Sequence, residues 1–183
     1  MLGTNQQYVV LCDEKGQTVA TKDKLQAHID GDLHLAFSVQ ICRPAQDGRT
    51  GYEWLLQQRA MNKYHSGGLW ANTCCSHPLL DETLAQACQR RVQEELNITV
   101  TAQVQTLTHF IYHAALDNQL IEHEYDYILL VEQDIQQFCP NSDEVMATQW
   151  CHSDDIQAWL KTKPEQFAVW FEQVFTRVNT YLD

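Results

Sequence analysis

One stretch, residues 69–98, constrains this chain more than any other, because it joins a turn rich in reactive side chains to an amphipathic helix. It reads LWANTCCSHPLLDETLAQACQRRVQEELNI. Leu84, Cys88, Val92 and Leu96 recur at every fourth position, which predicts a helix with one apolar stripe. The turn precedes this helix directly, and we expect the chemistry of the protein at this junction.

Two charged residues lie beside the apolar stripe of that predicted helix. Arg91 and Glu95 are four positions apart, so their side chains are neighbours on the helix surface. A carboxylate at the margin of a core-facing stripe is costly to desolvate unless something pairs with it. Arg91 or a metal ion can be that partner, and the sequence leaves both open.

The turn itself contains a thiol and an imidazole. Cys75 is a candidate proton donor or nucleophile, and His77 is a candidate metal ligand. Adjacent residues on an extended backbone point to opposite faces, so only one of Cys74 and Cys75 can line a given cavity.

The composition excludes several classes of protein. A chain of 183 residues with 44% apolar residues fits one globular domain over residues 1–183, and it has no apolar run of the roughly 20 residues that span a membrane. The N-terminus lacks a signal-peptide pattern and the seven cysteines form no CxxC pair, so we expect a cytoplasmic protein with reduced thiols. A net charge of −12 disfavours nucleic acid, and an anionic substrate needs local Lys, Arg and a divalent cation.

The order of predicted elements indicates a mixed α+β domain with a helix inserted between strands. Tyr8–Asp13 and Thr18–Ala20 predict a hairpin, and Thr21–His28 a short helix capped by Thr21. Further predicted strands are Leu33–Cys42, Tyr52–Arg59, Val104–His113, Gln119–Glu132 and Glu144–Cys151, with a turn at Asp117-Asn118. Two more helices are predicted, one from Ser153 to Lys161 and one that Pro164 opens.

Histidines and carboxylates offer candidate metal ligands. His28 and His34 bracket a turn, but a histidine chosen by composition alone is more often structural than a ligand. Glu122 and Glu124 share one face of a strand with Asp126, and carboxylates in line repel one another unless a cation or water intervenes. A solvated edge strand is the ordinary alternative. The apolar continuation YILLV favours a strand inside a sheet, and therefore metal binding or acid–base use.

Several of these motifs together resemble type I isopentenyl diphosphate isomerases of the Nudix superfamily. They are LHLAFS (33–38), LLQQR (55–59), WANTCCSHPL (70–79), RRVQEEL (90–96), EHEYD (122–126) and DEVMATQWC (143–151), in the order of the family. The resemblance implies a Nudix-like mixed β-sheet core sandwiched by helices, with an extra N-terminal β-hairpin. It also implies isomerisation of isopentenyl diphosphate to dimethylallyl diphosphate in isoprenoid biosynthesis.

The chain departs from the Nudix hydrolase signature G-x5-E-x7-R-E-U-x-E-E-x-G-U. Its counterpart runs from Ser76 to Ile98 and lacks both glycines, and Arg91 stands where the pattern has the Glu of its Arg-Glu pair. These losses resemble the isomerase branch, because a hydrolase needs this helix to assemble a metal cluster that activates water. A Nudix pyrophosphohydrolase of a nucleoside diphosphate derivative is the alternative, and a non-catalytic metal-binding module comes third.

The resemblance implies two metal sites. One divalent ion (Mn²⁺, Zn²⁺ or Mg²⁺) is expected on His28, His34, His77, Glu122 and Glu124. A Mg²⁺ ion that accompanies the substrate diphosphate is expected near Glu95 and the backbone carbonyl of Cys75. A flavin is not expected, because no glycine-rich dinucleotide motif is present.

The resemblance also implies the residues that bind and convert the substrate. The positions that match diphosphate-contacting residues are Lys24, Arg59, Lys63 and Arg91. The positions that match catalytic residues are Cys75, Glu124, Tyr112 and Trp170, although periodicity alone makes Trp170 a core residue. The reaction adds a proton to the terminal alkene carbon and removes one from C2. The sequence leaves open whether Cys75 or Glu124 donates the proton. We expect the protein to be a monomer or weak homodimer.

Overall fold

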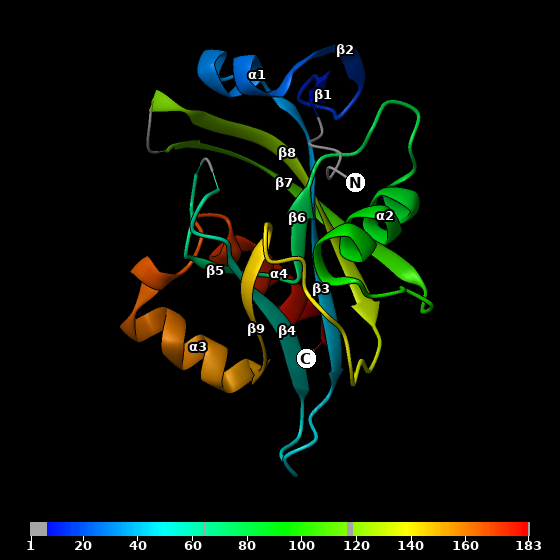
Figure 1. The fold of residues 1–183 in the computed structure, drawn as a ribbon, viewed down its shortest axis with the longest axis vertical. Helices are drawn as coiled ribbons and strands as arrows, with labels where there is room; N and C mark the ends of the chain where they lie inside the picture. The colour runs from blue at the N-terminus through cyan, green and yellow to red at the C-terminus, as the bar shows by residue number, and fades with distance from the viewer. Residues whose placement is uncertain (1–6, 64, 117–118, 183) are drawn as a thin grey trace.

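The computed structural model describes residues 7–63, 65–116 and 119–182, where one mixed sheet has helices on both of its faces (Figure 1). The strands are β1 (Tyr8–Cys12), β2 (Thr18–Asp23), β3 (His34–Pro44), β4 (Tyr52–Arg59), β5 (Trp70–Ala71), β6 (Cys74–Ser76), β7 (Val104–Ala115), β8 (Ile121–Glu132) and β9 (Val145–His152). The helices are α1 (Lys24–Asp30), α2 (Leu84–Leu96), α3 (Ser153–Thr162) and α4 (Phe171–Leu182), with a 3₁₀ turn at Pro164–Gln166. The expected α+β fold with an N-terminal hairpin is confirmed.

The centre of the sheet is the parallel pair β3 and β8. Their register runs from His34 opposite Glu124 to Cys42 opposite Glu132. β7 covers the other edge of β8, whereas β1, β4 and β6 pair with β3, and β9 pairs with β4. β8 is therefore an interior strand, as the apolar run after Asp126 predicted, and its carboxylates do not lie on a solvated edge.

Two apolar clusters hold the helices against the sheet. On one face, Cys88, Val92 and Leu96 of α2 are fully buried against β3 and β8. Cys74 belongs to this cluster, whereas Cys75 packs against the cluster on the opposite face, under α3 and α4. Both predictions for this region, the helix stripe and the opposed cysteines, are confirmed.

The first helix begins later than the sequence predicted. Thr21 does not cap a helix but pairs with Val10 in the β1–β2 hairpin, which continues to Asp23. The cap is Asp23, whose carboxylate accepts a hydrogen bond from the backbone N–H of Gln26 at 3.0 Å. The backbone hydrogen bonds of the hairpin outweigh the local capping preference of Thr21, so α1 begins at Lys24 and runs to Asp30.

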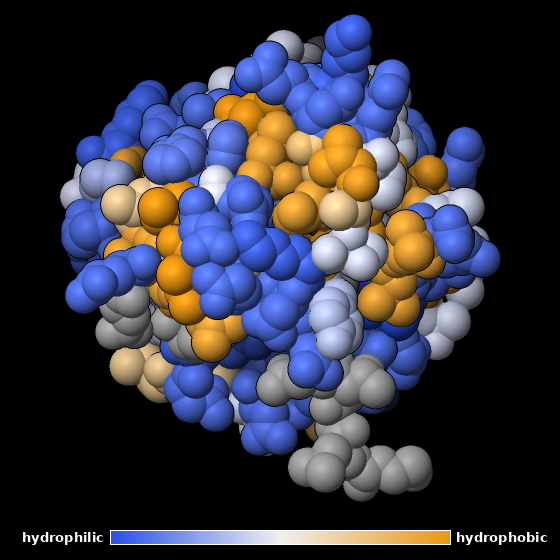
Figure 2. All heavy atoms as spheres, turned by 90° about the horizontal axis from the view of Figure 1, so that it is seen from above, coloured by the Kyte–Doolittle hydropathy of each residue, from blue (hydrophilic) through white to orange (hydrophobic). Residues whose placement is uncertain are grey.

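Helix α1 closes one end of the molecule and turns a histidine inward. Ala27 and His28 are fully buried, whereas Leu25 and Ile29 remain 55% and 48% exposed on its outer face. Figure 2 views the molecule from this end and shows apolar patches between hydrophilic side chains. The inward face of α1 thus supplies one wall of the site described below.

The last helix also begins later than predicted. Pro164 opens only a 3₁₀ turn, after which Phe167 forms a parallel bridge with Trp70. The backbone N–H of Ala168 donates to the carbonyl of Trp70 at 2.8 Å, which holds this segment extended. Helix α4 therefore begins at Phe171, and Trp170 lies in the turn before it.

The other predicted strands and the α3 helix are confirmed with ends shifted by a few residues. The predicted turn at Asp117-Asn118 lies outside the described residues. None of the helices within the described ranges combines the length and the apolar character that a membrane span requires.

Candidate active site

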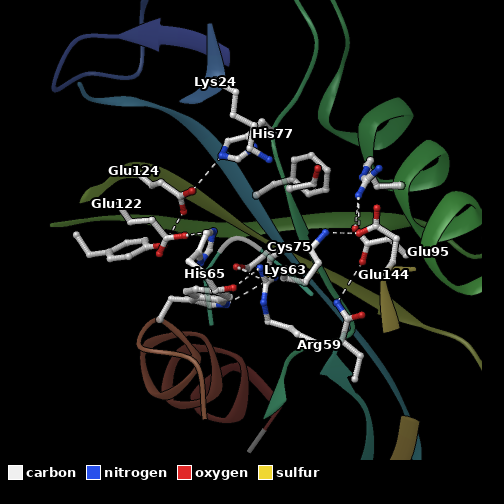
Figure 3. Close-up of a pocket in the computed structure, with 17 residues that line it drawn as sticks. Lys24, Arg59, Lys63, His65, Cys75, His77, Glu95, Glu122, Glu124 and Glu144 are labelled. Carbon is white, nitrogen blue, oxygen red and sulfur yellow. Dashed lines mark hydrogen bonds and ion pairs between the residues drawn. The ribbon is translucent and has the colours of Figure 1, made fainter. Parts of the chain in front are cut away.

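A pocket opens where the ends of β3, β4, β6 and β8 meet α1 and α2. Figure 3 shows Glu122, Glu124, His65 and His77 toward one side of it, Glu95 and Glu144 toward the other, and Cys75 between them. Its lining consists of Lys24, Phe37, Ser38, Gln57, Arg59, Lys63, His65, Cys75, Ser76, His77, Arg91, Glu95, Tyr112, Glu122, Glu124, Glu144 and Trp170. All four predicted diphosphate residues and all four predicted catalytic residues are among them.

A buried cluster of histidines and a carboxylate lies along one side of the pocket. His28, His34, His77 and Glu124 each place one potential ligand atom within 4.8 Å of the others. Glu124 lies 3.1 Å from Nε2 of His77 and 3.7 Å from Nε2 of His34. His28 and His34 do not line the pocket directly but stand behind it, brought to Glu124 by the β3–β8 register and by α1.

The chemistry of this cluster fits a divalent metal ion. Nδ1 of His28 and of His34 lies 2.7 Å and 2.8 Å from the backbone carbonyls of Lys24 and Asp32, so in the neutral rings Nε2 carries the lone pair. Among the residues that the structure describes, Nε2 of His34 and Nδ1 of His77 are buried without a hydrogen-bond partner. Buried imidazole nitrogens beside a carboxylate are the donor set of a borderline divalent cation.

Tyr112 connects the two glutamates. Its hydroxyl lies 2.9 Å from Oε2 of Glu122 and 2.6 Å from Oε2 of Glu124. Burial and the charge of Glu124 raise the pKa of Glu122 well above its ordinary value. Burial also acts to raise the pKa of Glu124, but the contacts with His34 and His77 outweigh it and hold that pKa well below its ordinary value. Glu124 is therefore the ionised member of the pair.

His65 is a site residue that the sequence analysis missed. Nε2 of its ring lies 3.3 Å from Oε1 of Glu122. Burial, followed by the charge of Arg59, lowers the pKa of His65 to about 3, so the ring is neutral. The only sequence signal was its position two residues after Lys63, the residue that the prediction assigned to diphosphate binding.

The thiol of Cys75 is enclosed by polar groups. It donates to Oδ1 of Asn72 at 2.9 Å and accepts a hydrogen bond from Nε1 of Trp170 at 3.0 Å. The amide of Asn72 is itself fixed, because its nitrogen donates to the carbonyls of Val39 and Cys74. Burial, followed by the charge of Asp126, raises the pKa of Cys75, so the group is a neutral thiol.

A buried serine and aspartate stand behind this thiol, and the sequence analysis gave them no role there. Oγ of Ser38 lies 3.5 Å from the sulfur and donates to Oδ2 of Asp126 at 2.8 Å. Both residues are 1% exposed, and Oδ1 of Asp126 has no hydrogen-bond partner among the described residues. The alternation of β8 places Asp126 on the same face as Glu122 and Glu124, as predicted.

The opposite side of the pocket combines cations and carboxylates. Arg91 contacts Oε1 of Glu95 at 2.5 Å, so of the two partners that the sequence left open for Glu95, the arginine is present. Gln57 donates to Oε2 of Glu95 at 3.2 Å, and Lys63 contacts Glu144 at 2.5 Å.

The cations retain donors that can receive an anion. Nε of Arg59 and Nε of Arg91 are buried with no hydrogen-bond partner in the described part of the chain. Buried guanidinium N–H groups without a partner cost free energy, and a phosphate group would remove that cost. Burial and the nearby charges of Lys63 and Arg91 lower the pKa of Lys24 to about 8. Lys24 lines this pocket together with three further cations, Arg59, Lys63 and Arg91, and this grouping indicates a site for a multiply charged anion.

Sequence comparisons place the chain among known enzymes. A NUDIX domain model matches residues 32–173. The isopentenyl-diphosphate Delta-isomerase of Photobacterium profundum is 47% identical over 173 residues, which cover 94% of each chain. Those of Aliivibrio fischeri strain MJ11 and Pectobacterium atrosepticum are 46% and 42% identical, and the matches cover 96% and 94% of this chain and 97% and 92% of theirs.

Solved structures share the fold at much lower sequence identity. DR0079 from Deinococcus radiodurans is 12% identical with a TM-score of 0.71, and the match covers 93% of this chain and 98% of that one. The NUDIX domain of Shewanella oneidensis NrtR, complexed with ADP ribose, is 14% identical with a TM-score of 0.62, and the match covers 81% of this chain and 88% of that one. At these identities the similarity demonstrates the Nudix fold alone.

Proposed function

The chain belongs to the isopentenyl-diphosphate Delta-isomerase family of NUDIX-domain proteins, and on that premise we propose that it converts isopentenyl diphosphate to dimethylallyl diphosphate. The observation that carries this proposal is that a thiol and a carboxylate, those of Cys75 and Glu124, line the same pocket. Burial raises the pKa of the thiol, and contacts with two histidines lower the pKa of the carboxyl group. A 1,3-allylic proton shift needs one group that holds a proton and another that accepts one.

The protonation states favour one assignment of the roles that the sequence left open. The S–H bond of Cys75 breaks, and its proton adds to the terminal alkene carbon, whose π electrons form the new C–H bond. The cation that results at C3 makes the C2–H bond strongly acidic, so the weakly basic carboxylate of Glu124 suffices to remove that proton. The electrons of the C2–H bond then form the C2=C3 double bond.

Neighbouring side chains support this assignment. The N–H of Trp170 already points at the sulfur and would stabilise the thiolate left after proton transfer. The electron-rich ring of Trp170, which is 3% exposed, would also attract the transient cation and help to exclude water from it. The hydroxyl of Tyr112 holds the carboxylate of Glu124, so Tyr112 orients the base.

The cationic side of the pocket suits the substrate diphosphate. Lys24, Arg59, Lys63 and Arg91 would contact its oxygens, and we propose that Mg²⁺ accompanies the diphosphate beside Glu95 and the carbonyl of Cys75. This placement puts the charged end of the substrate at Glu95 and Glu144 and its alkene between Cys75 and Glu124.

We propose that His28, His34, His77, Glu122 and Glu124 hold a second divalent ion. Mn²⁺, Zn²⁺ or Mg²⁺ is our choice, and imidazole-rich ligands favour the first two. When bound, the ion would neutralise the crowded carboxylates and fix the orientation of Glu124. No flavin is required by this chemistry.

A Nudix pyrophosphohydrolase is the competing function. Such an enzyme needs carboxylates on α2 that hold metal ions for water activation, but Arg91 occupies one of those positions and pairs with Glu95. This pairing favours the isomerase.

We expect the active species to be a monomer or weak homodimer of this one catalytic domain, because residues of a single chain build the whole proposed site. We expect neither a nucleic-acid nor a membrane partner. All seven cysteines are free thiols, which supports a reducing compartment such as the cytoplasm.

The deciding experiment is proton NMR of metal-loaded protein with isopentenyl diphosphate in D₂O. We expect the exomethylene signal to disappear, the dimethylallyl signals to grow, and deuterium to enter the new methyl group. An unchanged spectrum from protein that retains its metal would contradict the isomerase, and phosphate release from a nucleotide panel would then support the hydrolase.

A further inference from the structure

His65 is neither one of the expected metal ligands nor part of the proposed proton transfers. It nevertheless lines the pocket beside Glu122. It is 6% exposed, and its Nε2 lies 3.3 Å from Oε1 of Glu122 (Figure 3). His28, His65 and Glu122 form a second group of potential ligand atoms that lie within 4.8 Å of one another. This group shares His28 with the first.

The two groups of ligand atoms meet at His28, which belongs to both of them. An imidazole nitrogen coordinates a single ion, so His28 cannot serve two ions at once through Nε2. Glu122 joins His65 and not the group around Glu124, and its other oxygen accepts from Tyr112 at 2.9 Å. Ligand atoms on adjacent corners of an octahedral ion lie about 3 Å apart when the bonds are about 2.1 Å long. The 3.3 Å separation of His65 and Glu122 matches such a pair.

The ring of His65 is tethered in the way that metal-binding histidines are. In His28 and His34, Nδ1 is held by a backbone carbonyl while Nε2 faces the cluster. In His65, Nδ1 lies 3.2 Å from the hydroxyl of Ser66, and Nε2 again faces a carboxylate. Such outer contacts orient a metal-bound imidazole.

His65 is anchored by contacts of its backbone carbonyl and of its ring. Arg59 donates from its guanidinium to the carbonyl of His65 at 3.3 Å, and its backbone N–H donates to the carbonyl of Leu69 at 2.9 Å. The His65 ring also packs edge-on against Trp170, with 6.2 Å between the ring centroids. These contacts reduce the entropy that ordering this side chain on a ligand would cost.

We propose that His65 is a sixth ligand of the divalent ion, which it binds through Nε2 beside Glu122. With His28, His34, His77 and Glu124, this gives four imidazole nitrogens and two carboxylates around one ion. Such a nitrogen-rich set selects Zn²⁺, Co²⁺ or Mn²⁺ over Mg²⁺. The inference extends the metal site of the proposed function and names one more residue in it.

The test compares Co²⁺-loaded wild-type protein with His65→Ala, His65→Gln and His113→Ala. His113 is an exposed histidine on β7 and serves as the matched control. We expect both His65 variants to lose at least tenfold in Co²⁺ affinity, measured by chelator competition, and to show a changed visible Co²⁺ spectrum. His113→Ala should match the wild type in both. Circular dichroism of the metal-free proteins checks that each variant folds.

Two results would overturn the proposal. An unchanged affinity and spectrum in His65→Ala would mean that the ring does not reach the ion. Wild-type affinity and spectrum in His65→Gln would mean that any side chain able to hydrogen-bond Glu122 suffices, and that His65 only orients it. The isomerase activity is tested separately, by NMR measurement of isopentenyl diphosphate turnover on the same wild-type sample. The two tests are independent because the Co²⁺ spectrum reports the metal ligands whether or not the substrate reacts.

Discussion

The acid or base role of each side chain in this pocket depends on the residues that contact it. Cys74 and Cys75 are neighbours in the chain, but one is buried against α2 and the other lies among Asn72, Trp170 and Ser38. The same contrast separates Glu122 from Glu124, because only Glu124 contacts His34 and His77. Residue type alone therefore does not assign an acid or a base here; the partners of each side chain do.

Replacing the thiol should stop turnover without emptying the metal site. Cys75→Ala should lower kcat by about 10² to 10⁴, because it removes the proton donor. Its zinc or manganese content, measured by mass spectrometry, should remain at the wild-type value. Cys74→Ala is the matched control and should keep most of the activity. An active Cys75→Ala protein, or an equally inactive Cys74→Ala protein, would contradict the assignment.

Deprotonation of Lys24 should lower kcat/KM at high pH. Its pKa is lowered to about 8 by burial and by Lys63 and Arg91, so the ammonium loses its proton as the pH rises through that value. An uncharged amine attracts the diphosphate less, and kcat/KM should fall by about tenfold or more above pH 8. Lys24→Arg keeps its charge and should flatten this decline. The same decline in both proteins would exclude Lys24 as its cause.

Among the elements, α2 links stability to function most directly. Its apolar stripe packs against the sheet, while its outer margin carries Arg91 and Glu95 into the pocket. The helix begins with a capping box, in which Oγ1 of Thr83 accepts from the backbone N–H of Gln86 at 3.3 Å and Oε1 of Gln86 accepts from the N–H of Thr83 at 3.0 Å. The cap lies far along the helix from Arg91 and Glu95, so the two roles are separable.

Removing the cap should cost stability and spare catalysis. Thr83→Ala should lower the free energy of unfolding by about 1 kcal/mol, measured by urea denaturation, with turnover nearly unchanged under native conditions. Thr83→Ser keeps the hydroxyl and should retain most of that stability. A large loss of activity at wild-type stability would show instead that the helix start contacts the substrate.

In the whole molecule, the metal site joins parts of the chain that are far apart in sequence. His28 comes from α1, His34 from β3, His77 from the segment after β6, and Glu124 from β8. Bringing these buried polar groups together without a cation leaves ring nitrogens of His34 and His77 unsatisfied among the described residues. The metal should therefore stabilise the folded chain in addition to supporting the reaction.

Chelation should lower the melting temperature reversibly. At a metal concentration of about 100 times Kd, binding contributes about 2.7 kcal/mol, which for a domain of this size corresponds to about 5 to 10 °C. Differential scanning calorimetry of the metal-free, Mn²⁺-loaded and Zn²⁺-loaded proteins measures this difference. His34→Ala should reduce it strongly, and His113→Ala should not. Equal melting temperatures with and without bound metal would show that the cluster contributes nothing to folding.

The sequence by itself determined the features that depend on local periodicity and on motif identity. The four-residue spacing placed α2, strand alternation put Glu122, Glu124 and Asp126 on one face, and the extended backbone separated Cys74 from Cys75. These features depend on positions close together in the chain, where backbone geometry fixes the relation between side chains. The NTCCSHP and EHEYD motifs indicated the family for the same reason, because they are contiguous.

Only the tertiary structure decided the features that depend on contacts between distant segments. Pairing with Val10 overrode the capping preference of Thr21, and the bridge from Phe167 to Trp70 delayed α4 until Phe171. The parallel register of β3 with β8 pairs Ala36 with Asp126, which allows the side chain of Ser38 to reach Asp126, and the fold after β4 brought His65 to Glu122. Such contacts follow from strand register and packing, in which every element constrains the others. A pattern read along the chain carries no information about them.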